Sequence, residues 1–314
     1  MVNALVGWVT ACAIACEWRV SAVVSFVKEA PPVKLDEKII QVTDSEEWFY
    51  LETAPAEPTD KLPVVLLHGL PSRSLCWGEI MPALTEAGYR AIAPDWIGFG
   101  GSSKPVTYEF KYQPDGFIAA LDRFLDAMEL PKFSLVVQGF LGSVGIQYAL
   151  RNPERIARLA ILNAPIAPGA KLPFLMQLWG WPLVGEMQTQ DPLLVDRALE
   201  GGSGMVIDDA NLDIYRRPIL KSSMAGRVIV ATVRGLQLDK ATAEIAEGLS
   251  KWSGQALIVW GMADPWLDSA PAEKLGDAPN FELLKLPEAK HYPQEHWSGE
   301  IAPAIVNFLR RQDL

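Results

Sequence analysis

The sequence predicts an α/β fold, in which a mostly parallel central sheet is covered by helices on both faces. Apolar strand patterns alternate with helical patterns along most of the chain. The segments at 64–69 and 133–139 are apolar almost throughout, which is typical of parallel strands buried on both faces. The chain has 314 residues, of which 49% are apolar, so it can build a large buried core.

The expected strands are short and rich in β-branched, aromatic or other apolar residues. They cover 38–43, 47–53, 64–69, 89–96, 133–139, 158–165, 255–265 and 281–291. The first two are joined by a turn at Asp44 and Ser45. The expected core helices carry apolar residues at helical spacing. They cover 74–88, 115–130, 142–152 and 299–311. The first of these helices should end at Gly88, and the second ends before Pro131.

The alternation breaks over residues 167–250, which contain no comparable buried strand. Short helical patterns interrupted by proline and glycine fill this stretch instead. We therefore expect one α/β core, built from 38–166 and 251–314, with a helical cap at 167–250 inserted between two strands. An apolar segment and a polar linker, residues 1–37, precede the core.

Charge and cysteine content exclude several classes of function. The formal net charge is -10, and no Lys/Arg cluster is present, so we do not expect a nucleic-acid partner. The three cysteines, Cys12, Cys16 and Cys76, form no disulfide framework, which favours an intracellular reducing compartment. No Cys/His cluster has metal-ligand spacing, and we expect neither a metal nor another cofactor.

Residues 1–27 are unusually apolar. The uninterrupted run ends at Cys16, which is too short to cross a bilayer, and charged residues follow it. We favour contact with a membrane surface, with Trp8 and Trp18 at the interface. A helix packed on the body of the protein and a targeting remnant remain alternatives.

Five motifs occur in order along the chain: "LLHGLP", "DWIGFGGSSKP", "LVVQGFLG", "VWGMADPWL" and "EAKHYPQEH". With them, residues 38–312 resemble the α/β-hydrolase superfamily, and within it the haloalkane dehalogenase and epoxide hydrolase branch. This resemblance implies a strand-turn-helix elbow that presents a nucleophile, followed by an acid loop and a histidine loop. The elbow also resembles a branch from oxygenic phototrophs, which implies a plastid or membrane-peripheral location as an alternative.

The resemblance assigns Asp264 to the acid position and His291 to the base position. It places the backbone N–H groups of Leu70 and Phe140 at the oxyanion hole. The position of the covalent nucleophile falls on Gly139, which has no side-chain atom that could attack a substrate. The apolar side chains of Leu70 and Phe140 also stand where many dehalogenases carry halide-binding donors. We therefore do not expect haloalkane dehalogenase activity.

No other residue is a convincing substitute nucleophile. Ser143 lies one helical turn beyond the elbow, and Cys76 fits a buried core thiol. The strand-end residue His68 fits a structural role. Because Leu141 occupies a position that usually needs a small residue, we expect the turn at Gly139 to be relaxed.

Asp264 and His291 would form an acid-base dyad. We expect a cavity beside this dyad that is apolar and therefore suited to a small molecule. Leu70 and Phe140 contribute to it. The remaining lining residues are aromatic: Trp77, Trp96, Trp266, Phe174, Trp179 and Trp181.

Three functions fit these observations. The first is a non-enzymatic protein that binds an apolar small molecule or a protein partner. The second is a non-covalent enzyme, in which His291, oriented by Asp264, acts as a general base on a water or a substrate proton. The third is a hydrolase that uses an unrecognised nucleophile. The apolar segment at 1–27 leaves a structural role in a membrane-associated assembly as a further alternative.

Overall fold

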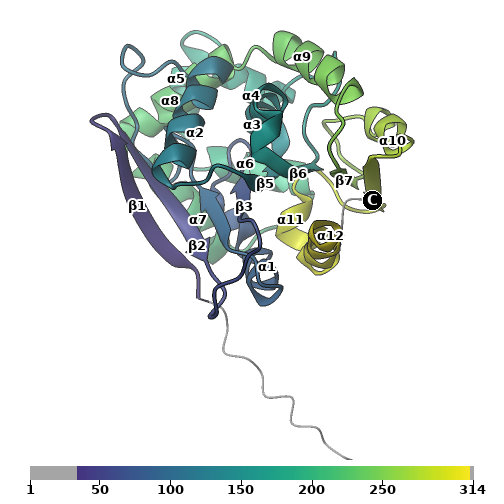
Figure 1. The fold of residues 1–314 in the computed structure, drawn as a ribbon. Helices are drawn as coiled ribbons and strands as arrows, with labels where there is room; N and C mark the ends of the chain where they lie inside the picture. Colours follow the sequence, from purple (N-terminus) through teal and green to yellow (C-terminus); the bar gives the residue numbers. More distant parts are fainter. Residues whose placement is uncertain (1–33, 312–314) are drawn as a thin grey trace, which may run out of the picture. The chain divides into compact units, whose positions relative to one another are not determined.

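The computed structural model describes residues 34–311 of the chain (Figure 1). Its centre is one eight-stranded sheet with the order β1-β2-β4-β3-β5-β6-β7-β8. The strands are β1 (Asp36–Thr43), β2 (Glu46–Thr53), β3 (Val64–Leu67), β4 (Ala91–Pro94), β5 (Phe133–Gln138), β6 (Ile156–Leu162), β7 (Ala256–Gly261) and β8 (Phe281–Leu286). Only β2 runs antiparallel to its neighbours β1 and β4. The predicted α/β fold with a mostly parallel sheet is confirmed.

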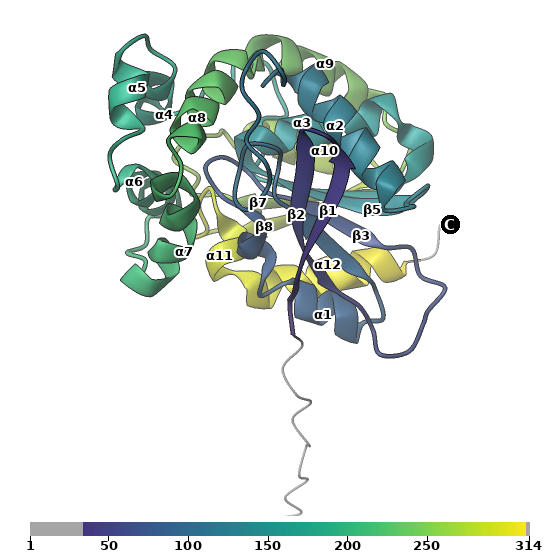
Figure 2. The ribbon, with the colours of Figure 1, turned by 90° about the vertical axis from the view of Figure 1, so that its left-hand side faces the viewer.

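Helices cover both faces of the sheet (Figure 2). One face carries α2 (Pro114–Ala127), α3 (Gly139–Arg151), α9 (Leu238–Ser250) and α10 (Ala270–Gly276). The other face carries α1 (Met81–Glu86) and α12 (Ser298–Arg310), together with the short α11 (Pro293–His296). Figure 2 shows the cap helices gathered at one side of this core. They are α4 (Phe174–Trp179), α5 (Val184–Gln188), α6 (Leu194–Ser203), α7 (Asp209–Leu220) and α8 (Ser223–Gly235).

Strand β5 shows why the central strands are apolar throughout. Successive side chains of a strand point to opposite faces of the sheet. Leu135 and Val137 pack in the cluster that contains α2 and α3, whereas Val136 packs in the cluster that contains α1 and α12. Since both faces are covered, all six residues of β5 are buried.

The structure divides the helix that the sequence predicts at 74–88. A 3-10 turn spans Ser74–Trp77, and α1 begins only at Met81. Pro82 explains the interruption, because proline lacks an N–H donor and is tolerated in the first turn of a helix.

Helix α9 lies inside the predicted cap but contacts the core. Gln147 and Arg151 of α3 both donate hydrogen bonds to Glu244 of α9, at 2.6 and 2.7 Å. A side chain at Gly248 would collide with Leu150, so α9 packs closely on α3. The helices that stand apart from the core therefore end at α8.

The apolar segment at 1–27, with its predicted membrane-surface contact, lies outside the described residues. Within residues 34–311, no helix combines the length and apolar character needed to cross a bilayer.

The loop after β4 depends on a buried carboxylate. Asp95 accepts hydrogen bonds from the backbone N–H groups of Ser74 and Gly101, at 2.6 and 2.7 Å. His68 accepts a bond from the N–H of Trp96 at 3.2 Å, and burial lowers the pKa of this imidazole. These contacts join the loops after β3 and β4, so Asp95 and His68 serve the fold.

Replacing Asp95 with alanine tests this role. Asp95→Ala leaves two backbone donors without their acceptor in a buried loop, so the free energy of unfolding should fall by about 3 kcal/mol. Urea denaturation measures this change. Asp60→Ala, in an exposed loop, is the control and should change stability by less than about 0.5 kcal/mol. Equal stability of the two variants would contradict the role assigned to Asp95.

Candidate functional site

The turn from β5 to α3 keeps a left-handed backbone. Gly139, the first residue of α3, has φ +70°. Glycine adopts this conformation without the steric cost that a side chain imposes. The expectation of a relaxed turn is therefore wrong: Leu141 is accommodated in the buried core, and the turn stays tight.

An acid-base pair lies at the carboxyl ends of the neighbouring strands. Nδ1 of His291, in the loop after β8, lies 2.9 Å from Oδ2 of Asp264, in the loop after β7. Asn163 donates to the same oxygen at 2.8 Å, and the N–H of Trp266 donates to Oδ1 at 2.8 Å. A carboxylate can only accept, so the imidazole proton belongs on Nδ1 and the Nε2 lone pair points away from the acid.

These contacts decide the charge of Asp264. Burial works to raise the pKa of this carboxyl group. The electrostatic interaction and hydrogen bond with His291, with the donors from Trp266 and Asn163, outweigh burial and hold the pKa of Asp264 below its usual range. Asp264 is therefore a stable anion that orients His291.

The elbow faces the imidazole. A Cβ atom built on Gly139 would lie 3.5 Å from Nε2 of His291 and 4.0 Å from the backbone nitrogen of Leu70. Nε2 is buried and has no hydrogen-bond partner among the described residues. A side chain at position 139 would therefore point towards Nε2 of His291 and the backbone N–H group of Leu70.

Aromatic rings enclose His291. The ring of Phe140 stacks on the imidazole at 5.1 Å between centroids, and the ring of Trp266 lies at 4.6 Å. The exposed fraction of His291 is 0%. A water-sized molecule therefore does not reach the imidazole in this conformation.

The cap completes the enclosure. The N–H of His291 donates to the carbonyl of Gly202, in α6, at 3.0 Å. A side chain at Gly202 would collide with the rings of Trp266 and Tyr292, so glycine permits α6 to approach this closely. The hydroxyl of Tyr292 donates to the carbonyl of Leu70 at 3.0 Å and links the histidine loop to the loop after β3.

The structure brings only some of the predicted pocket residues to this site. Trp266 contacts His291. Trp96 and Trp179 are buried in the large cluster on the same face of the sheet, where Trp96 packs against Trp48 and Phe117 rather than against the dyad. Trp77 packs in the cluster on the opposite face of the sheet, because the 3-10 turn after β3 directs it there. The prediction that Trp77 lines a cavity beside the dyad is therefore corrected.

Phe174 and Trp181 require the same correction. Their side chains are 66% and 50% exposed, and they pack edge to face with each other at 6.3 Å. Both belong to the outer surface of α4 and the turn after it.

Sequence reasoning missed two features near the dyad. Asn163, which follows β6, donates a hydrogen bond to Asp264. Its position at the end of a strand next to β7 could have indicated a residue of the site. A cavity of about 370 Å³, lined by residues 164–171 with Trp260, Trp266 and Leu267, adjoins the dyad through Trp266.

Among residues 34–311, no cluster of three His, Cys, Asp or Glu side chains could hold a metal ion.

Comparisons with known proteins agree with this geometry. The α/β hydrolase fold family matches residues 63–195. A haloalkane dehalogenase from Psychrobacter cryohalolentis is 35% identical, and the match covers 89% of this chain and 94% of that protein. A haloalkane dehalogenase from Mesorhizobium japonicum is 27% identical over 83% of this chain and 87% of its own length.

Solved structures show the same fold. The haloalkane dehalogenase DbeA from Bradyrhizobium elkani superposes with a TM-score of 0.78 at 22% identity, covering 88% of this chain and 98% of that one. The novel haloalkane dehalogenase DatA from Agrobacterium tumefaciens C58 superposes with a TM-score of 0.75 at 21% identity, covering 88% of this chain and 96% of that one. The chain belongs to the α/β-hydrolase superfamily, in its haloalkane dehalogenase-like branch.

A second polar contact joins the cap to the core. Tyr215, in α7, donates a hydrogen bond to Oε1 of Glu295, in α11, at 2.7 Å. Burial raises the pKa of Glu295 to about 7, and the bond from Tyr215 only partly offsets this shift. The folded protein therefore holds a proton on Glu295 that the unfolded chain releases near pH 4.5.

The stability of the protein should reflect this proton. A raised pKa of an acid stabilises the fold fully below the unfolded pKa, and that stabilisation disappears as pH rises from about 4.5 to about 7. Glutamine does not titrate, so Glu295→Gln should not show this loss. Its free energy of unfolding should rise by up to about 3 kcal/mol relative to that of the wild type between pH 5 and pH 8. Urea denaturation at each pH measures the difference, with Glu57→Gln, in an exposed loop, as the control. A difference that stays constant with pH would contradict the assignment.

Proposed function

We propose that this protein is a non-catalytic member of its family, which has lost the covalent nucleophile and binds an apolar small molecule. The position of Gly139 carries this proposal. Its missing side chain is directed at Nε2 of His291, 3.5 Å from the Cβ position, and glycine can form no ester intermediate.

Two further residues support the loss of the family's reaction. The side chains of Leu70 and Phe140 are apolar and fully buried, so neither can donate a hydrogen bond to a leaving halide. The names of the relatives describe them as haloalkane dehalogenases. For this chain we propose that the dehalogenase reaction is absent.

The cavity beside Trp266 is the proposed site of the ligand. Its volume of about 370 Å³ suits a small molecule. Alanine, proline, isoleucine and tryptophan side chains form much of its wall, and Lys171 and Asp268 add two charged groups to it. Trp266 separates this cavity from His291. A shift of this one ring would open a path between the ligand and the imidazole.

A second function, general-base catalysis without a covalent intermediate, rests on the complete dyad. Asp264 orients His291, and Nε2 carries a lone pair that no described residue uses. A substrate that displaced Trp266 could transfer a proton to Nε2 while the N–H of Leu70 bound an anion. The complete enclosure of His291 is the observation against this function.

A protein partner is a further candidate ligand. Phe174 and Trp181 form an exposed aromatic pair on the cap. Aromatic side chains are enriched at protein interfaces, so this pair supports a docking surface.

Substrate hydrolysis distinguishes these functions. With p-nitrophenyl acetate, styrene oxide and iodobutane, the wild type should turn over no faster than His291→Ala. Gly139→Ser restores a hydroxyl facing Nε2 and should hydrolyse the ester about a hundredfold faster, in a manner that requires His291. Gly142→Ser is the matched control, because its side chain would face Val137 and Ala164.

Two outcomes would contradict the proposal. Wild-type turnover that His291→Ala abolishes would establish general-base catalysis instead. Wild-type turnover that survives His291→Ala would indicate an unrecognised nucleophile. The melting temperature of Gly139→Ser checks that the strained serine, at a cost of about 1–2 kcal/mol, leaves the protein folded.

Ligand binding gives an independent test. Toluene should shift the indole N–H NMR signal of Trp266, which Trp266→Phe identifies by its disappearance. Ala167→Trp fills the cavity and should abolish the shift, whereas Ala54→Trp, at an exposed position, should preserve it. A toluene shift that survives Ala167→Trp would place the ligand elsewhere.

A further inference from the structure

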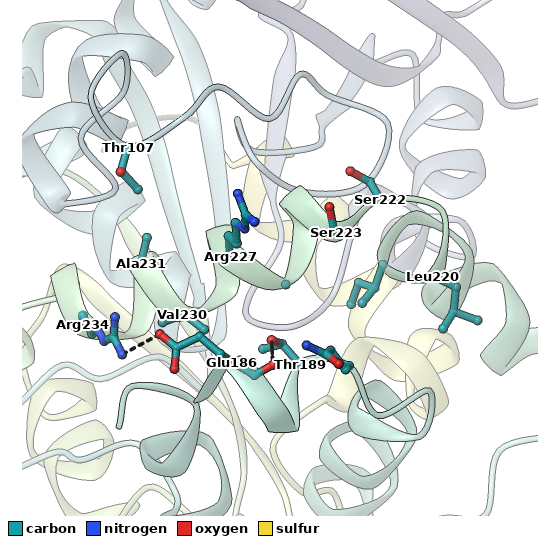
Figure 3. A pocket seen from close by; sticks show the side chains of 13 residues that line it. Thr107, Glu186, Thr189, Leu220, Ser222, Ser223, Arg227, Val230, Ala231 and Arg234 are labelled. Atoms are coloured by element: carbon teal, nitrogen blue, oxygen red, sulfur yellow. Dashed lines mark hydrogen bonds and ion pairs between the residues drawn. The ribbon is translucent and has the colours of Figure 1, made fainter. Parts of the chain in front are cut away.

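A larger cavity, of about 640 Å³, lies within the cap (Figure 3). It is bounded by α5, by the end of α7 and by α8, and Thr107 of the core also lines it. Glycine at 226 lets α8 pack tightly against Thr189, at the end of α5, so these helices hold the cavity's shape. None of its lining residues belongs to the dyad or to the cavity beside Trp266.

The charge in this cavity is positive although the protein is acidic. Two arginines and one glutamate line it, which leaves a net charge of +1, against -10 for the whole chain. Glu186 is paired with Arg234 at 3.1 Å. Arg227 has no carboxylate partner among the described residues, and its recorded contact is the sulfur of Met224 at 3.9 Å.

Hydroxyl groups accompany the unpaired arginine. In Figure 3, Arg227 and Ser223 of α8, and Ser222 just before it, project on the side of Thr107, whereas Glu186 and Arg234 lie on the other side. The Ser222 oxygen accepts a bond from the N–H of Met224 at 3.2 Å, so its proton remains available to an anion. Arginine and hydroxyl donors together favour a carboxylate or phosphate group.

Apolar side chains form the rest of the wall. Ile219 and Leu220 come from the end of α7, and Val230 and Ala231 come from α8. Leu220 is 53% exposed, so part of this apolar wall is open to a ligand. A cavity of this size could hold a chain of several methylene groups beside the polar end.

We propose that this cavity is a second ligand site, which binds a small amphiphile with one anionic head group and an aliphatic tail. Arg227 and the neighbouring hydroxyls bind the head, and the four apolar side chains contact the tail. The site acts independently of the dyad, so it stands whether or not the function proposed above is correct.

Three probes of equal chain length test the proposal by isothermal titration: octanoate, octylamine and octanol. Octanoate should bind saturably to the intact protein, octanol about tenfold more weakly, and octylamine not at all. Arg227→Gln should weaken octanoate about tenfold and leave octanol unchanged. Arg217→Gln is the matched control, because it removes the same charge from α7, where Arg217 is paired with Asp213.

Ala167→Trp, which fills the cavity beside Trp266, should leave octanoate binding unchanged, which separates this test from those of the proposed function. Three results would overturn the proposal. They are no saturable octanoate binding at concentrations up to about 1 mM, equal affinity for octanoate and octylamine, or equal losses in Arg227→Gln and Arg217→Gln.

Discussion

The hydrogen bond between Asp264 and His291 is the interaction on which the rest of the site depends. It joins the loops after β7 and β8, and Asn163, after β6, holds the same carboxylate. Gly139 faces the imidazole from the end of β5. Four neighbouring parallel strands thus deliver one residue each to a single edge of the sheet, as expected of open α/β sheets. The carbonyl of Gly202 then attaches the cap to the same histidine.

The dyad can persist without catalysis, for a physical reason. Asp264 is a buried anion, and removing one partner of a buried pair leaves an uncompensated charge, which typically costs 3–5 kcal/mol. His291 and Asn163 therefore compensate this charge whether or not a reaction uses them. Charge compensation does not explain Nε2 of His291, which is buried without a partner among the described residues. That nitrogen is the one feature of the dyad that a purely structural role leaves unexplained, and it keeps general-base chemistry as the competing function.

The strand and helix pattern was sufficient to predict the sheet, and the motifs placed Gly139, Asp264 and His291 at its edge. Pattern alone could not show which way individual aromatic side chains point. Trp77 and Trp266 both follow strand ends, yet one packs on the far face of the sheet and the other on His291. The sequence pattern also could not predict that His291 is enclosed. This enclosure depends on Gly202 in α6, and the position of α6 is set by tertiary packing.

The central claim is that this site cannot form a covalent intermediate. Intact-protein mass spectrometry of the wild type, after incubation with p-nitrophenyl acetate, styrene oxide and iodobutane, tests it most directly. We expect no adduct at the elbow or beside His291 of the wild type with any of the three reagents, while Gly139→Ser acquires one acetyl group from the ester at the introduced serine. A wild-type adduct located by peptide mapping at the elbow, or on any residue beside His291, would contradict the account.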